Sequence, residues 1–139
     1  MTQPSSLFPT SMFGSVTEEL TLESVAAKLL YFQEQIHLKH WQTSSFAEHK
    51  ALGKLYEYIQ DFRDEVVEKL MGYTGRKVKV FKMDPLSETM GHMEMVDNLI
   101  TFARSLVTWA KLNNYPDVEN MAQSLSGTAA QTKYLLTLS

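Results

Sequence analysis

The residues best suited to chemistry are histidines and carboxylates in the first half of the chain. His37, His40 and His49 lie within 13 residues of one another, and Asp64 and Glu68 follow. Neutral imidazole nitrogen and anionic oxygen together suit iron or zinc without any thiolate. The chain contains no cysteine, so thiolate metal sites, disulfides and cysteine nucleophiles are excluded. Any metal site here is therefore expected to use imidazole and carboxylate ligands.

The spacing of these residues decides which of them could share an ion. Asp64 and Glu68 are four residues apart, so on a helix their carboxylates project from one face. His49 precedes Asp64 by 15 residues, about 22 Å along a continuous helix, and cannot share an ion with it inside one subunit. At about 100° per residue, the carboxylate pair also points away from the apolar stripe centred on Ile59. A metal site therefore predicts a two-fold partner whose antiparallel helix brings His49 opposite the carboxylates.

Other interpretations of these residues stay open. Glu34, His37 and His40 could form a small site of their own, since they lie three residues apart on one helix face. A histidine buried against a neighbour and an acidic helix face in water are the structural alternatives. Residues predicted to lie beside the site or in an interface, without binding the ion, are Trp41, Asp61 and Glu65.

Two long helices are predicted to position these residues. No proline occurs over residues 10–84, and apolar residues recur at intervals of three and four. The first helix is expected from residue 22 to about 41, with Thr21 as its N-cap, and the second from residue 46 to about 73. Ser45 begins a capping-box pattern and is the expected N-cap of the second helix.

The second half of the chain predicts one more helix pair. Residues 76–83 alternate valine with lysine and indicate a connection with a short extended piece. Helical spacing resumes over 87–112, is interrupted at 113–116, and continues from Asp117. Short links within each pair and a long one between the pairs predict an all-α, ferritin-like four-helix bundle.

Composition limits the domain organisation and the partners. We expect a flexible leader over residues 1–16 and a single bundle domain over 17–139. The formal net charge is −3 and the basic residues cluster only over 76–82, so DNA binding is not expected. The chain lacks a long apolar run and a secretory signal pattern, which predicts a cytoplasmic protein with no membrane partner. It also lacks the motifs of P-loop hydrolases, serine hydrolases and zinc proteases.

The run from His40-Trp41 through His49 to Asp64-x-x-x-Glu68 resembles the signature region of the miniferritins, the Dps-like family of DNA-protecting, iron-oxidising proteins. The resemblance covers about 30 residues of 139. It implies twelve-subunit shells, Fe(II) oxidation, and ligation by these histidines facing the two carboxylates of a neighbouring subunit. Three features differ from the family: a shorter turn between the helices, Gly53 in place of an Asp ligand, and no basic N-terminal arm.

A second likeness points to a source. Residues 37–70 and 133–138 are similar to small helical proteins encoded by tailed phages, which implies the host cytoplasm as location and no particular activity. The leading hypothesis is a homo-oligomer, with a two-fold interface through the second helix, that binds iron or zinc and oxidises Fe(II). The alternative is a non-catalytic phage-encoded helical oligomer, acting as a structural protein or as a binder of a host protein or small signalling ligand.

Overall fold

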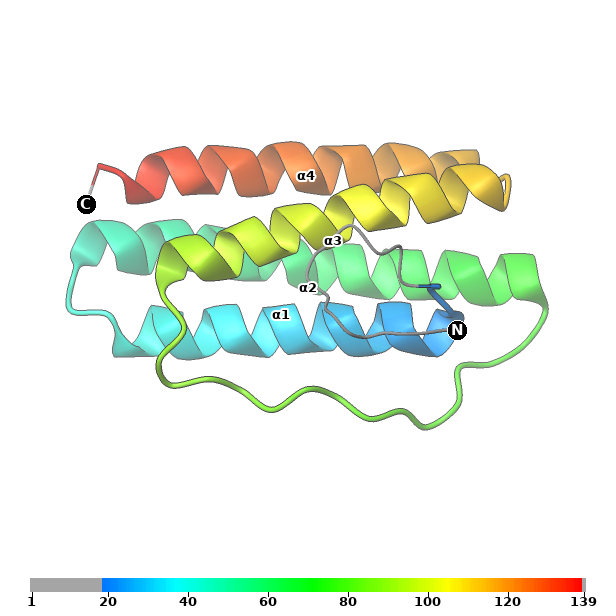
Figure 1. The fold of residues 1–139 in the computed structure, drawn as a ribbon, viewed down its shortest axis with the longest axis horizontal. Helices are drawn as coiled ribbons and strands as arrows, with labels where there is room; N and C mark the ends of the chain where they lie inside the picture. The colour runs from blue at the N-terminus through cyan, green and yellow to red at the C-terminus, as the bar shows by residue number, and fades with distance from the viewer. Residues whose placement is uncertain (1–18, 139) are drawn as a thin grey trace, which may run out of the picture.

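The computed structural model describes residues 19–138, and these form four helices (Figure 1). The helices are α1 (Leu22–Gln42), α2 (Phe46–Thr74), α3 (His92–Leu112) and α4 (Pro116–Leu136). No strand occurs in this part of the chain, which confirms the all-α prediction. The leader predicted over residues 1–16 lies outside the described residues.

The four helices form a bundle with one long crossover (Figure 1). Residues 43–45 join α1 to an antiparallel α2, and residues 113–115 join α3 to an antiparallel α4. The crossover over 75–91 returns alongside α1 to the end where α2 began, so α2 and α3 run in the same direction. Ferritin-like bundles also have one long crossover, but unrelated proteins share this connectivity, so it carries no information about iron.

Local sequence signals fix the start of α1 and both ends of α2. Thr21 and Ser24 form a reciprocal capping box at the start of α1, and the Ser45 side chain accepts the Glu48 N–H at the start of α2. Gly75 ends α2 in the left-handed conformation with φ of 70°, which glycine adopts without the steric cost of a Cβ atom. These observations confirm the predicted caps of the first two helices.

The predicted start of the third helix at residue 87 was wrong, because α3 begins at His92. The Ser87 hydroxyl accepts the backbone N–H groups of Thr89 and Met90, which makes a turn. The Gln35 amide binds both the N–H and the carbonyl of Ser87. Local and tertiary hydrogen bonds therefore hold this segment out of the helix. The extended piece predicted over 76–83 forms no strand in the described chain.

The apolar stripes of the four helices meet in one core. Fully buried members include Leu29, Leu52, Ile59, Leu99 and Leu125. α1 packs mainly on α2, α3 mainly on α4, and α2 also packs on α4. No helix within residues 19–138 is both long and apolar enough to cross a membrane.

Candidate functional site at the histidine end

All four histidines of the chain lie at one end of the bundle. His37 and His40 occupy the last turns of α1, His49 the first turn of α2, and His92 is the first residue of α3. The C-terminal end of α4 reaches the same end (Figure 1). We call this the histidine end: the α1 C-terminus, the α2 N-terminus, the α3 N-terminus and the α4 C-terminus. Side chains far apart in sequence are therefore brought together here.

His40 and His49 form a reciprocal pair across the turn between α1 and α2. Their rings stack with centroids 3.8 Å apart and planes 16° apart. Nδ1 of His40 lies 2.7 Å from the carbonyl oxygen of His49, and Nδ1 of His49 lies 2.8 Å from the carbonyl oxygen of His40. Since a carbonyl only accepts, each Nδ1 must carry a proton, and the lone pair of each neutral ring is on Nε2. The pair satisfies two backbone carbonyls and fixes α1 against α2.

Gly53 makes room for this pair. A Cβ atom at Gly53 would lie 2.9 Å from Cε1 of His40, closer than a normal van der Waals contact. The sequence comparison with miniferritins identified Gly53 as a lost ligand position. In this fold the missing side chain has a packing reason, because the His40 ring lies directly on the backbone of α2.

His37 lies between two aromatic rings. Its ring centroid is 4.0 Å from that of Trp41 and 3.9 Å from that of Tyr56. Burial lowers the pKa of His37, and the nearby His40 lowers it further. His37 is therefore neutral at pH 7, and its ring packs between those of Trp41 and Tyr56. Tyr56 was not predicted as a site residue, since it is indistinguishable in sequence from the other apolar positions of its stripe.

Exposed apolar side chains also gather at the histidine end. Trp41 and Phe46 are 68% and 74% exposed, and the ammonium group of Lys50 lies 5.7 Å from the Phe46 ring centroid. Five large apolar side chains are exposed at this end: Trp41, Phe46, Met93, Tyr134 and Leu138. At the opposite end of the described bundle the corresponding residues are Tyr73 and Leu112. Exposed large apolar side chains on the helices and just after α4 are therefore more numerous at the histidine end, and Val80 and Leu86 on the crossover are exposed as well.

A polar row on α1 holds the crossover where it reaches the histidine end. Gln35 is fully buried and Lys39 is nearly so. The Lys39 ammonium donates to the Glu88 carbonyl at 2.8 Å, and the Gln42 amide donates to the Glu88 carboxylate at 3.3 Å. This row was not predicted, although the spacing of residues 35, 39 and 42 places them on one helix face and is the sequence signal that could have indicated it.

The carboxylates of the predicted metal site lie elsewhere. Asp64 and Glu68 are exposed and border a cavity of about 240 Å³ between α1, α2 and the crossover. Arg63 forms an ion pair with Asp64 at 3.2 Å and also donates to the Gln33 side chain. His49 is on the same helix 15 residues earlier, as the spacing predicted. Within residues 19–138 no three histidine or acidic side chains come together as a metal site, so the predicted site needs a second subunit.

The other two acidic residues predicted beside that site belong to a different surface. Asp61 and Glu65 border a groove between α2 and α4, not the cavity bordered by Asp64 and Glu68. Two acidic pairs on one helix therefore open to two different surfaces.

A family model matches residues 40–136, most of the chain. The chain belongs to a family of unknown function, DUF5856. The DUF5856 match begins at His40 and so includes the His40–His49 pair, Gly53 and three complete helices. The histidine end is therefore largely within the family region of this DUF5856 chain.

The DUF5856 chain is also similar to an uncharacterised 14.6 kDa protein from the mobD-ri intergenic region of enterobacteria phage T4. The two are 27% identical over 110 residues, 79% of this chain and 83% of the relative. This confirms the likeness to small phage proteins, whereas neither match is a miniferritin. No solved structure matches the chain.

Proposed function

We propose that this DUF5856 protein is a non-catalytic binding protein that docks a partner protein at its histidine end. The observation that carries the proposal is the pair of exposed aromatic side chains, Trp41 and Phe46, on the turn between α1 and α2. Tryptophan is enriched among the residues that contribute most to binding energy at protein interfaces. Concentrated exposed apolar surface is also the usual mark of an interaction site.

The rigidity of the surface supports this function. Trp41 lies at the end of α1 and packs at a tilt against His37, which in turn stacks on Tyr56 of α2. The reciprocal hydrogen bonds of His40 and His49 hold the two helices together beneath it. A side chain held in place before binding loses less conformational entropy on association. The end therefore offers a preorganised aromatic anchor.

The phage relative gives the setting for this proposal. A phage-encoded protein of this kind acts in the host cytoplasm, where its partner is a host protein.

The test compares three full-length proteins. Wild type, Trp41→Ala and Leu112→Ala are used to capture proteins from a lysate of the bacterial host, and each captured protein is then purified and titrated directly. Leu112 is the matched control, because it is 80% exposed at the opposite end. We expect direct binding by wild type and Leu112→Ala, with affinity for Trp41→Ala at least about 30-fold weaker. Equal binding by all three, or no direct binding, would contradict the proposal.

We propose inter-subunit metal binding as a second function, favoured by the orientation of the histidine pair. Metal-binding histidines usually donate one ring N–H to a carbonyl or carboxylate, which directs the other nitrogen to the ion. His40 and His49 both donate from Nδ1 to backbone carbonyls. Iron or zinc would then take their Nε2 atoms together with Asp64 and Glu68 of a second subunit, with Fe(II) oxidation as the associated activity.

Metal analysis tests this second function. The untagged protein is loaded with Fe(II) under anaerobic conditions, exposed to air, and its metal content and mass in solution are measured. Asp64→Ala should abolish metal uptake while helicity is retained, and Asp97→Ala, an exposed acid on α3, should leave uptake unchanged. Stoichiometric metal in Asp64→Ala would rule the assignment out.

A further inference from the structure

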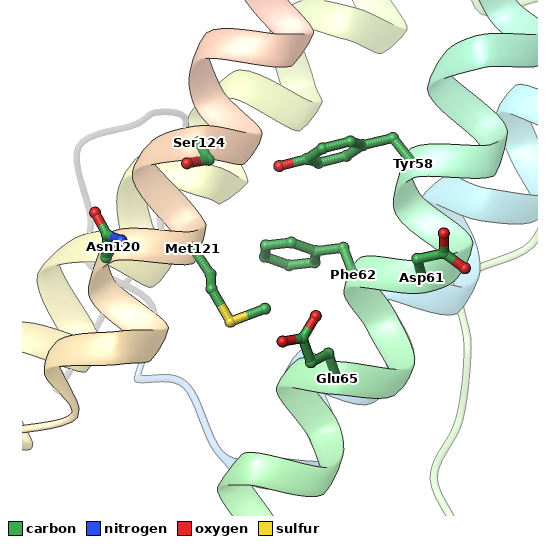
Figure 2. A pocket seen from close by; sticks show the side chains of 7 residues that line it. All are labelled: Tyr58, Asp61, Phe62, Glu65, Asn120, Met121 and Ser124. Atoms are coloured by element: carbon green, nitrogen blue, oxygen red, sulfur yellow. The ribbon is translucent and has the colours of Figure 1, made fainter.

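A separate groove lies between α2 and α4, on the side of the bundle (Figure 2). Its volume is about 310 Å³, within the lower range of small-ligand sites. Its α2 side is formed by Tyr58, Asp61, Phe62 and Glu65, and its α4 side by Asn120, Met121 and Ser124. Tyr58 follows Phe46 by 12 residues, about 18 Å along α2, so the groove is distinct from the histidine end.

The walls of the groove combine aromatic, hydroxyl and carboxylate groups. Figure 2 shows the Tyr58 hydroxyl pointing across the groove toward α4 and Ser124, and Phe62 and Met121 facing one another beneath it. The Glu65 carboxylate lies beside Phe62 and Met121. The rings of Tyr58 and Phe62 are stacked with centroids 6.3 Å apart. Aromatic faces, a carboxylate and hydroxyl oxygens are the groups that recognise an organic cation.

The negative charge at the groove is not neutralised by an ion pair within residues 19–138. Neither Asp61 nor Glu65 forms an ion pair among residues 19–138. The neighbouring cations are already engaged, since Arg63 pairs with Asp64 and Lys69 pairs with Asp117. Like charges four residues apart on a helix repel one another, as Asp61 and Glu65 must. No basic side chain borders the groove.

From this charge complementarity we infer that the groove binds a small organic cation, an ammonium or guanidinium group on an apolar stem. The stem would pack on Met121 and extend toward Tyr58, and the cation would meet the Glu65 carboxylate beside the Phe62 ring. The side chains of Tyr58 and Ser124 border one edge of the groove, which favours a small molecule over a long peptide segment. This inference concerns a different surface from the proposed partner site and does not depend on it.

The experiment titrates full-length protein with putrescine and with agmatine, which share a four-carbon stem, and with uncharged 1,4-butanediol. Binding is followed by calorimetry and by the NMR signal of the Met121 methyl group. The variants are Glu65→Gln, in the groove, and Glu57→Gln, a matched change of charge on an exposed position of the same helix. Glutamine is a good helix former, so both variants are expected to fold, and circular dichroism checks this.

We expect saturable binding of at least one amine, a Met121 methyl shift, and no binding of butanediol. Glu65→Gln should weaken binding about tenfold, and Glu57→Gln by less than about twofold. If the two variants weakened amine binding equally, the binding would depend on the overall negative charge of the helix and not on the groove, and the inference would be overturned. Absence of saturation up to millimolar amine would overturn it as well. So would saturable binding of a lysine-containing peptide when neither free amine binds.

Discussion

The two ends of the bundle use the same kinds of side chain in different ways. At the end opposite the histidines, the Tyr73 hydroxyl donates to Asp117, the Tyr73 ring stacks on Tyr115 at 4.4 Å, and Trp109 meets the edge of Tyr115 at 5.7 Å. We call this the tyrosine end. At the tyrosine end the aromatic rings therefore pack on one another. At the histidine end, Trp41 packs at a tilt against His37 and remains 68% exposed.

The two ends differ in which side chains hold the short interhelical link in place. At the tyrosine end the rings themselves close residues 113–115 over the core. At the histidine end the His40–His49 hydrogen bonds join α1 to α2 across residues 43–45. The exposed aromatic side chains are therefore not needed to hold this link in place. Aromatic residues that do not hold the fold together are available for a partner. The comparison therefore predicts that one end determines stability and the other binding.

The largest expected effect separates these two roles directly. Tyr115→Ala should lower the free energy of unfolding by about 2 to 3 kcal/mol, because the ring is half-buried and packs against the core. Trp41→Ala should change it by less than about 1 kcal/mol, since most of that side chain is exposed. Urea unfolding followed by circular dichroism measures both. Similar destabilisation by the two substitutions would show that Trp41 is structural and would break the comparison.

Two glycines of α2 provide the next test. At Gly72, near the tyrosine end, a Cβ atom meets no other heavy atom within 4 Å, so Gly72→Ala should stabilise the protein by about 0.5 to 1 kcal/mol through helix propensity. At Gly53 the same gain is opposed by displacement of the His40 ring, which costs about 1 to 3 kcal/mol. Gly53→Ala should therefore be neutral to destabilising.

The Gly53 substitution has a readout that helix propensity does not change. If the His40 ring moves, its hydrogen bond to the His49 carbonyl is lost, and the NMR signals of both imidazoles should shift. Gly72→Ala should leave these signals unchanged. Stabilisation by Gly53→Ala with unshifted imidazole signals would mean that the pair tolerates a methyl group, and Gly53 would lose its role in the site.

The helices could be predicted from sequence because their signals are local. Thr21 and Ser45 act as caps within one turn of their own helices, and the stripe around Ile59 is buried as its period indicated. The start of α3 could not be predicted from local sequence, because the Gln35 side chain that binds Ser87 is 52 residues away in the chain. The same limit applied to the candidate site.

The histidines were identified as important residues from sequence, but their contacts were not. The stacking of His37 between Trp41 and Tyr56 depends on how α1 lies on α2, and residue spacing along one helix does not contain that information. The role of Gly53 likewise depends on a ring from another helix. Conversely, the conclusion that His49 and Asp64 cannot meet within one chain needed only the rise of a helix, and the structure bears it out.

The smallest expected effect concerns pH, and it should again separate the two ends. Burial lowers the pKa of His37, so the unfolded chain takes up a proton first as the pH falls below 6.5, and the histidine end loses stability from there downward. At the tyrosine end, hydrogen bonds from Arg76 and from the Lys79 backbone lower the pKa of Glu23 to about 2, and the Tyr73 hydroxyl lowers that of Asp117. These lowered values contribute stability at neutral pH that is lost only as the pH falls below about 4.5.

Between pH 7 and pH 5, therefore, only the histidine end should loosen. Amide hydrogen-exchange protection factors for residues 40–53 should fall in this range, while those for residues 109–118 should not change. His37→Gln removes this ring and should reduce the pH dependence at the histidine end without altering the tyrosine end. An undiminished loss of protection at the histidine end in His37→Gln would show that His37 is not its source. An equal loss of protection at both ends would mean that the bundle responds to pH as one cooperative unit and that the two ends are not energetically separate.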